Sequence, residues 1–399
     1  MTKERMIRNL NLIGKIDIIN DFDKIFSKNM KFLVTNVIND EHYFEMTGES
    51  MYYALKECEE ISAISQLERK EKIISSLQNR KKACNGVFVH KSFIGENDTQ
   101  LRSTSAVIRT FLEARKDGFT VDHDIIEVVN HHYSHYFKWN TGIWFCHDTS
   151  ELKGNAPLSH VKTKAFNKSK KNTLTLNTHL DSLTTLFMVI NSNIECNADL
   201  EVLANKAIQS LNILFKFDKN KNYLNNILQK IDNAFFDHYL ISLSRNKENL
   251  LSKFYQKIIH PTFFKIISPT VFFKNGFIAR DLAVLNIHVD YLTVNITDFL
   301  RLLIVYDKVT QKSLNRLRKL DRESILDKVS SAIDLIETNK NLKSYILASD
   351  LQSAWYAELH YLYSFYDSKY KNIVKEIEQS NLYNLRTTSF ADMIIKKEL

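Results

Sequence analysis

The sequence predicts an all-α protein, because turn-forming residues are scarce and apolar residues recur with helical spacing. The 399-residue chain contains 8 Gly and 3 Pro, where average usage gives roughly 28 and 20. Sandwiches and barrels need many Gly- and Pro-rich turns, so we exclude both classes. Within residues 176–187 and again within 285–296, apolar side chains step by 4, 3 and 4 positions, which is one face of an α-helix.

Five segments carry this helical pattern, and the chain between them lacks the signs of a domain boundary. In chain order, the segments are residues 99–114, 174–187, 283–296, 324–339 and 353–374. Neither a βαβ alternation nor a Pro/Ser-rich linker interrupts the chain. We therefore expect one helical domain over residues 1–399, with residues 1–80 as a candidate peripheral extension.

A turn–loop–helix unit recurs along the chain. The motif Asn-x-His-x-Asp occurs twice, as Asn177, His179 and Asp181 and as Asn286, His288 and Asp290. A third copy, which begins at Arg102, lacks the His and the Asp. Each copy follows a glycine-led turn, at residues 85–86, 141–142 and 275–276. Solenoids repeat at a fixed period, which is absent here. The unit therefore favours a closed ring of helical hairpins, an (α/α)6-type toroid with variable loops on one face.

The repeated motif allows a structural and a functional interpretation. Residues two positions apart in a helix lie about 200° apart around its axis, so His179 and Asp181 cannot face one point from mid-helix. In the structural interpretation, Asn177 caps the helix, Asp181 complements its dipole and His179 packs. In the functional interpretation, the starts of several helices lie together on one rim of the toroid and bind hydroxyl groups or anions.

Three other segments offer candidate binding residues. "GIWFCHDTSE" places His147 and Asp148 after Trp144, and aromatic walls beside polar groups suit a sugar. A buried turn anchored by Trp144 is the alternative. His131 and His135 have the i, i+4 spacing of a metal pair but lack the Glu of HExxH, so a mixed helix face is favoured. "SAWYAELHYLY" contains Glu358 among aromatic residues that suit either a core or a site.

Charge, cysteine usage and hydropathy indicate a cytoplasmic protein. The N-terminus lacks the apolar stretch of a secretory signal, and no apolar run approaches the length of a membrane span. The four cysteines are scattered, as free thiols in a reducing compartment are. The net charge of +8 is spread along the chain. This favours a solvated surface or an anionic small molecule over nucleic acid or a membrane.

Several motifs with defined chemistry are absent from the sequence. It contains no GxGxxG, GxxxxGK[ST], HExxH or GxSxG. We therefore expect no nucleotide cofactor, no metal and no nucleophile-elbow hydrolysis.

Short segments resemble two families of sugar epimerases. "LNTHLDSLTTLF" is similar to the inner-helix segment of N-acylglucosamine 2-epimerases, and "SAWYAELHYLY" to a late aromatic–Ala–Glu helix of the same family. "GIWFCHDTSE" followed by "LNTHLDSL" resembles the end of glucuronyl C5-epimerases. Asp181 stands where the 2-epimerases have Glu, and Leu176 where the C5-epimerases have Tyr. Both families are (α/α) toroids.

The resemblance implies proton abstraction next to a carbonyl or carboxylate, with return to the opposite face. His179 and His288 are then the acid/base pair, because histidine titrates near neutral pH. Asp181 and Asp290 orient them. Arg102 and Arg280, together with Asn177, Asn286, Trp144, His147, Asp148 and Glu358, bind the substrate, a small sugar or anionic oligosaccharide.

Two other functions remain open at this stage. A glycoside hydrolase or polysaccharide lyase needs carboxylates flanking the bond, and the candidates are Asp148, Asp181, Asp290 and Glu358. In a non-catalytic helical scaffold, the only role of the repeated Asn-x-His-x-Asp motif is to cap helices. The sequence leaves the oligomeric state open.

Overall fold

The computed structural model is mostly helical and forms a single body. Apart from short pieces, it describes residues 44–57, 62–83, 97–139, 141–153, 172–196, 199–219, 250–260, 271–273, 275–283, 287–312 and 316–370. The all-α prediction is therefore confirmed at this level. Of the candidate peripheral extension, residues 1–43 lie outside the described residues.

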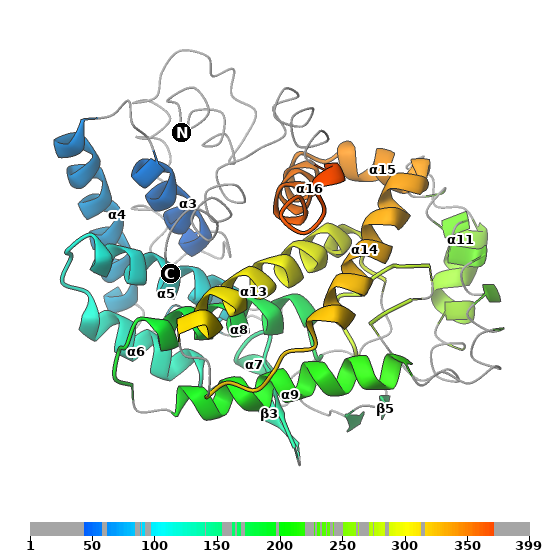
Figure 1. Ribbon diagram of the computed structural model, residues 1–399, viewed down its shortest axis with the longest axis horizontal. Coiled ribbons are helices and arrows are strands. Elements are labelled where there is room, and N and C mark those ends of the chain that lie inside the picture. The colour runs from blue at the N-terminus through cyan, green and yellow to red at the C-terminus, as the bar shows by residue number, and fades with distance from the viewer. Residues whose placement is uncertain are drawn as a thin grey trace.

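Five helices form a row through the middle of the molecule (Figure 1). In chain order they are α3 (Phe44–Glu57), α5 (Leu101–Lys116), α8 (Leu176–Asn191), α13 (Leu292–Lys312) and α16 (Asp350–Tyr363). Each packs against the next: α3 on α5, α5 on α8, α8 on α13 and α13 on α16. We call these the inner helices. Helix α3, within the first 80 residues, belongs to this row.

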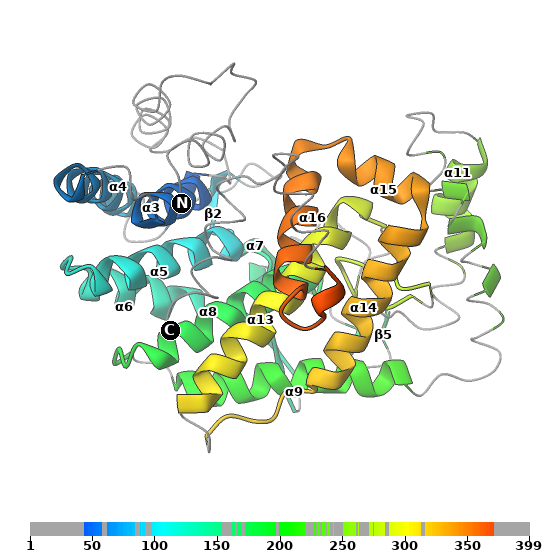
Figure 2. The same cartoon turned by 45° about the horizontal axis from the view of Figure 1, so that its top comes forward.

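A second set of helices covers the inner row from outside (Figure 2). These outer helices are α4 (Ala63–Ala83), α6 (Asp122–His132), α9 (Leu200–Lys219) and α14 (Arg322–Thr338). Each follows an inner helix in sequence and contacts it: α4 on α3, α6 on α5, α9 on α8 and α14 on α13. The short α15 (Lys340–Leu347) connects α14 to α16. Inner and outer helices therefore form helical hairpins, with the apolar core between the layers.

Minor elements lie in the connections. They are α7 (Ser150–Lys153), α11 (Leu250–Phe254), the π-helix η2 (Tyr255–Ile259), and the 3₁₀ turns η3 (Val289–Tyr291) and η4 (Ser368–Tyr370). The described strands form three antiparallel pairs: β1 (His90–Lys91) with β2 (Asn97–Asp98), β3 (Tyr136–Lys138) with β4 (Ile143–Phe145), and β5 (Lys162–Thr163) with β6 (Asn167–Lys168).

The glycine-led turns predicted from the sequence close small hairpins that pack on outer helices. Gly142 ends the turn between β3 and β4, where Trp139 donates its N–H to the Gly142 carbonyl. A Cβ at Gly142 would lie 2.3 Å from the hydroxyl oxygen of Ser210 on α9. Gly276 has a φ of +94°, and a Cβ there would lie 2.2 Å from the carbonyl oxygen of Ser331 on α14. In both copies the glycine-led turn thus packs on the outer helix of the same hairpin, and the turn at 85–86 lies outside the described residues.

The second motif copy differs from the first because its helix starts later. A helix was expected over residues 283–296, but α13 begins at Leu292 after the 3₁₀ turn η3. The cause is a pairing between distant segments, in which Leu282 and Ala283 donate their N–H groups to the carbonyls of Leu174 and Thr173. This pairing holds residues 281–283 beside the start of α8. His288 and Asp290 therefore precede the α-helix, whereas His179 and Asp181 lie within one.

No helix in the described part of the chain has both the length and the apolar character needed to cross a membrane. Cys146 and Cys196 are free thiols, the first of them buried.

Candidate functional site

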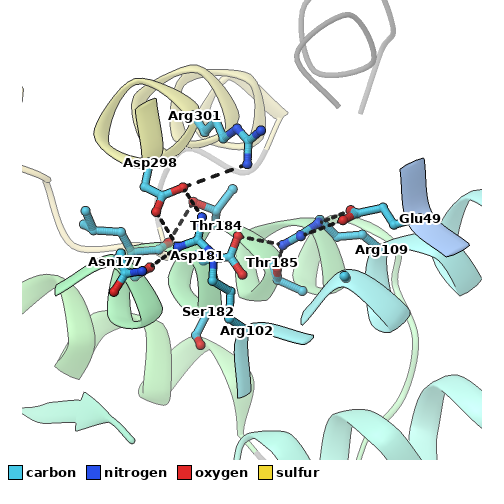
Figure 3. A network of polar contacts seen from close by, with 12 residues as sticks. Glu49, Arg102, Arg109, Asn177, Asp181, Ser182, Thr184, Thr185, Asp298 and Arg301 are labelled. Atoms are coloured by element: carbon cyan, nitrogen blue, oxygen red, sulfur yellow. Dashed lines mark hydrogen bonds and ion pairs between the residues drawn. The ribbon is translucent and has the colours of Figure 1, made fainter. Parts of the chain in front are cut away.

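Buried charged side chains connect the inner helices to one another, and Figure 3 shows most of them. Arg102 on α5 donates two hydrogen bonds to the carboxylate of Asp298 on α13, at 2.6 and 3.0 Å. It also donates to the backbone carbonyl of Asn177 on α8, at 3.2 Å. One guanidinium thus joins three inner helices.

Arg109, two turns further along α5, makes a second junction. Its guanidinium donates to the carboxylate of Glu49 on α3 at 2.6 and 3.1 Å. It also donates to Asp181 Oδ1 at 3.0 Å and to the hydroxyl of Thr185 at 2.7 Å. Both acceptors lie on α8, so Arg109 fixes α8 against α3.

Arg301 on α13 makes the third junction. It donates to Glu358 on α16 at 2.6 Å and lies 3.9 Å from Asp298. The indole of Trp355, also on α16, lies under the guanidinium groups of both Arg301 and Arg102, at 5.0 and 5.6 Å. The inner-helix network, as we call it, comprises Glu49, Arg102, Arg109, Asp181, Asp298, Arg301 and Glu358.

Two carboxyl groups of this network have their pKa values moved in opposite directions. Burial raises the pKa of Asp181, but Arg109, Arg102 and Arg301 outweigh that effect and lower it overall. At Asp298, burial and the charge of Asp181 raise the pKa, and the attraction of Arg102 does not fully offset them. The arginines thus favour the ionised form of Asp181, and Asp298 is the easier of the two to protonate.

The first Asn-x-His-x-Asp motif is divided between two faces of α8. Asp181 faces the inner-helix network, whereas His179 points into the apolar core. The His179 ring stacks on Trp144 with centroids 4.0 Å apart, and its Nδ1 accepts the backbone N–H of Phe145 at 3.2 Å. Burial lowers the pKa of His179 to about 3, with a smaller opposing effect from the carbonyl of Ala207. Asn177 lies in the first turn, and the N-cap residue is Thr175.

The second motif lies in different surroundings. The side chain of His288 is 29% exposed, and its Nε2 lies 3.9 Å from Asp281. Asp281 also binds the Arg280 guanidinium at 2.7 and 2.8 Å. The exposed Asp290 accepts a hydrogen bond from the Tyr345 hydroxyl. The predicted pair of His179 and His288 thus comprises one core residue and one half-buried residue. Asn286 lies outside the described residues.

Of the other predicted residues, His147 and Asp148 lie just before α7, and Trp144 lies in the core. His147 bonds through Nδ1 to the hydroxyl of Thr178 at 2.9 Å, and Asp148 accepts the N–H of Ser150 at 3.0 Å. Both are partly exposed. The ring of Trp144 is fully buried, and its Nε1 donates to the carbonyl of Thr175 at 3.2 Å. Trp144 is therefore part of the core and not the wall of an open pocket.

His131 and His135 lie close together, with ring centroids 4.6 Å apart. His135 bonds through Nδ1 to the carbonyl of His131, and the ring of His131 bonds to the hydroxyl of Thr99. Across the described residues, no group of three or more His, Cys, Asp or Glu side chains is placed to hold a metal ion.

Several charged residues of the site were not singled out from the sequence. Arg109 and Arg301 are each the one charged residue in a mainly apolar stretch, at residues 106–112 and 299–305. A lone charge in such a run must find a buried partner, and that was the available signal. Glu151 gave no such signal, although it is buried and accepts the N–H groups of His147 and Thr173 at 2.8 Å each. Burial raises the pKa of Glu151 to about 8.

No protein-family model, curated protein or solved structure matches this chain.

Proposed function

We propose that the protein is a carbohydrate-active enzyme built as an (α/α) toroid, with its reaction at the inner-helix network. The order of the inner helices and their outer partners supports the toroid. The positions of the charged residues support the site. Arg102 lies in the first turn of α5, and Asp181 and Asp298 lie in the second turns of α8 and α13. Arg102, Asn177, Asp181 and Glu358, predicted as site residues from distant segments, meet there.

The observation that carries the proposal is a pair of buried carboxyl groups on the packed helices α8 and α13, Asp181 and Asp298, whose pKa values are moved in opposite directions. Enzymes that cleave glycosidic bonds use one protonated and one ionised carboxyl group. In this proposal Asp298 donates its proton to the leaving glycosidic oxygen. Asp181 accepts a proton from the water that attacks the anomeric carbon. The C–O bond breaks, a new C–O bond forms from water, and both charges are restored by proton exchange.

Epimerisation is the second candidate, and His288 favours it. His288 is half-buried beside Asp281, and burial and the charge of Arg280 lower its pKa, so the ring is a neutral base at pH 7. A base of this kind can remove a proton from a carbon next to a carbonyl. The reaction needs a second acid/base group, and the predicted partner His179 is enclosed in the core.

A non-catalytic helical scaffold is the third candidate. It is favoured by the burial of the network, in which the Arg102 side chain is 7% exposed and that of Asp298 1%. In a scaffold these ion pairs only hold the helices together. Substitution there then lowers stability without affecting any turnover.

The test incubates the full-length chain with a panel of oligosaccharides, amino sugars and uronates in deuterated water. New reducing ends support hydrolysis, and deuterium at a sugar carbon supports epimerisation. Asp181→Asn should abolish the activity found, while Asp307→Asn, a change at a partly exposed ion pair on the same α13 helix as Asp298, should keep it. If the wild-type chain converts no member of the panel, the enzyme proposal fails. If it converts one and Asp181→Asn remains fully active, the reaction does not take place at the inner-helix network.

A further inference from the structure

A chain of side-chain contacts runs from Glu151 on α7 through two threonines to Asp281, on the segment that precedes η3. Thr173 Oγ1 lies 2.5 Å from Glu151 Oε1 and 2.8 Å from Thr175 Oγ1. Thr175 Oγ1 lies 2.7 Å from Asp281 Oδ1. Glu151, Thr175 and Asp281 are at most 3% exposed, and Thr173 is half-buried. Three contacts of hydrogen-bond length thus connect two buried carboxyl groups.

These three contacts need three hydrogens, and the two threonines supply only two. With both carboxyl groups ionised, Thr173 donates to Glu151 and Thr175 donates to Asp281. No hydrogen then remains for the contact between the two hydroxyl groups. A protonated carboxyl group has an O–H of its own and supplies the missing hydrogen. All three contacts are therefore hydrogen bonds when one of the two carboxyl groups carries a proton.

The charges around Asp281 favour its ionised form. The guanidinium of Arg280 binds Asp281 Oδ2 at 2.7 and 2.8 Å. The ring of His288 lies 3.9 Å from the same oxygen. An ion pair of this kind stabilises the carboxylate over the neutral acid. Thr175 therefore donates its hydrogen to Asp281.

The surroundings of Glu151 favour its neutral form. No cation among the described residues is paired with it, and its neighbours include the carboxyl group of Asp148 and the buried thiol of Cys146. Its carboxyl oxygens accept the backbone N–H groups of His147 and Thr173. Burial raises the pKa of Glu151 to about 8, and the charge of Asp148 adds to the increase. The proton of the chain therefore lies on Glu151 at neutral pH.

We propose that Glu151, Thr173, Thr175 and Asp281 form a proton relay, in which the ion pair between Arg280 and Asp281 keeps Glu151 protonated. The hydrogen bonds of the relay have one direction. Since Thr175 donates to Asp281, Thr173 must donate to Thr175. Thr173 is then left as an acceptor for the O–H of Glu151.

The relay moves its proton when Arg280 no longer holds the charge of Asp281. Glu151 then gives its proton to Thr173 Oγ1, and Thr173 passes its own hydrogen to Thr175 Oγ1. Thr175 in turn passes its hydrogen to Asp281 Oδ1. Three O–H bonds break and three form, so Glu151 becomes a carboxylate and Asp281 becomes neutral.

This transfer also changes the basicity of His288. Burial and the charge of Arg280 lower the pKa of His288, whereas the charges of Asp281 and Asp290 oppose that effect. A neutral Asp281 no longer opposes it, so His288 becomes a weaker base. Glu151 is therefore a positioning residue for His288. The inference rests on the proposed function only in this use, because epimerisation is the candidate that needs His288 as a base.

Titration of Glu151 by NMR in the full-length chain tests the relay. The readout is the chemical shift of the side-chain carboxyl carbon in isotope-labelled glutamate, and Glu151→Gln identifies the signal by its absence. The wild-type midpoint should lie near pH 8. In Thr175→Val, Thr173 has no hydroxyl partner other than Glu151 and donates to its carboxylate. The midpoint should therefore fall by at least about one pH unit.

Arg280→Met tests whether the ion pair controls Glu151 from the other end of the relay. This variant removes the cation beside Asp281 and changes no atom in contact with Glu151. Because Asp281 can then take the proton, the Glu151 midpoint should again fall by at least about one pH unit.

Two controls separate the relay from general effects of substitution. Thr178→Val removes a hydroxyl that bonds to His147 and lies outside the relay, so it should leave the midpoint unchanged. Thr175→Ser keeps the hydroxyl and should retain the wild-type midpoint.

A wild-type midpoint below about pH 5, as in an ordinary glutamate, overturns the inference. An unchanged midpoint in either Thr175→Val or Arg280→Met also overturns it. None of these titrations needs a substrate. The predicted shifts without turnover of any panel sugar contradict the proposed enzyme and leave the relay standing. Turnover of a panel sugar without the shifts does the reverse.

Discussion

The two faces of α8 differ in how they use buried polar groups. On one face, Asp181 forms an ion pair with Arg109, and its second carboxylate oxygen meets no donor among the described residues. On the other, His179 is stacked on Trp144 and accepts a backbone N–H. Both side chains are almost fully buried, at 2% and 0% exposure. Burial alone therefore does not separate a site from a core, whereas the chemistry of the neighbouring groups does.

The largest loss of stability is expected for a substitution on the Asp181 face of α8. Arg109→Met leaves Glu49 and Asp181 as buried charges without this partner, and breaking a buried pair in this way costs about 3–5 kcal/mol. Urea unfolding measures the loss. Arg322→Met is the matched control, because Arg322 pairs with Asp307 and its side chain is 47% exposed. It should cost about 1 kcal/mol or less. Similar losses for the two variants would argue against a distinct buried network.

On the aromatic face, His179→Ala should destabilise the protein by about 3 kcal/mol. It creates a cavity beside Trp144 and leaves the N–H of Phe145 without its acceptor. The fluorescence of a buried indole should shift to the red in the same variant. His123→Ala, at a side chain that is 85% exposed, should change stability by no more than about 0.5 kcal/mol. If His179→Ala is as stable as the wild type, the ring is not a packing residue.

A third comparison is between two glycines with similar φ angles, Gly276 in a repeated hairpin and Gly118 just after α5. Gly276 and Gly118 have φ values of +94° and +92°, but only Gly276 lies against another backbone. Gly118→Ala should cost about 1 kcal/mol for the left-handed conformation alone. Gly276→Ala adds the contact with Ser331 and should cost at least about 2 kcal/mol. Equal costs by thermal unfolding would contradict the close packing of this hairpin on α14.

The last effect is a pH dependence that originates at Glu151, outside both faces, and is spread over several pH units. Its pKa is about 8 in the folded protein against an ordinary value of 4.5. Between these values the folded chain holds a proton that the unfolded chain releases, so stability falls as pH rises, by up to about 1.4 kcal/mol per unit. Glu151→Gln should remove this contribution. Urea unfolding at several pH values would give parallel profiles for wild type and variant if Glu151 were ionised at neutral pH.

Local sequence pattern was sufficient to predict the helices but not all of their starts. The helix at Leu176 follows from the spacing of its apolar residues, and the turns at Gly142 and Gly276 were found as a repeat. The start of α13 depends on hydrogen bonds from Leu282 and Ala283 to a segment more than 100 positions earlier. No pattern within residues 283–296 encodes that pairing.

The candidate site was also predictable only in part, because sequence spacing does not show which side chains tertiary packing brings together. The angle between positions two apart in a helix already separated His179 from Asp181. The charges around Asp181 could not be deduced, because its partner Arg109 and the neighbouring Asp298 are brought near it by the packing of α5 and α13 on α8. Sequence spacing fixes which residues share a face, whereas tertiary packing decides what that face meets.

The central claim is that the Asp181 face of α8 carries function and that the His179 face carries stability. The most direct test measures two variants, Asp181→Asn and His179→Phe, on whichever panel sugar the wild type converts. Asp181→Asn should reduce kcat/KM by at least about a hundredfold, while His179→Phe should lower Tm and keep kcat/KM within about threefold, as expected of a core packing change. Loss of activity in His179→Phe at unchanged Tm, together with full activity in Asp181→Asn, would contradict the claim.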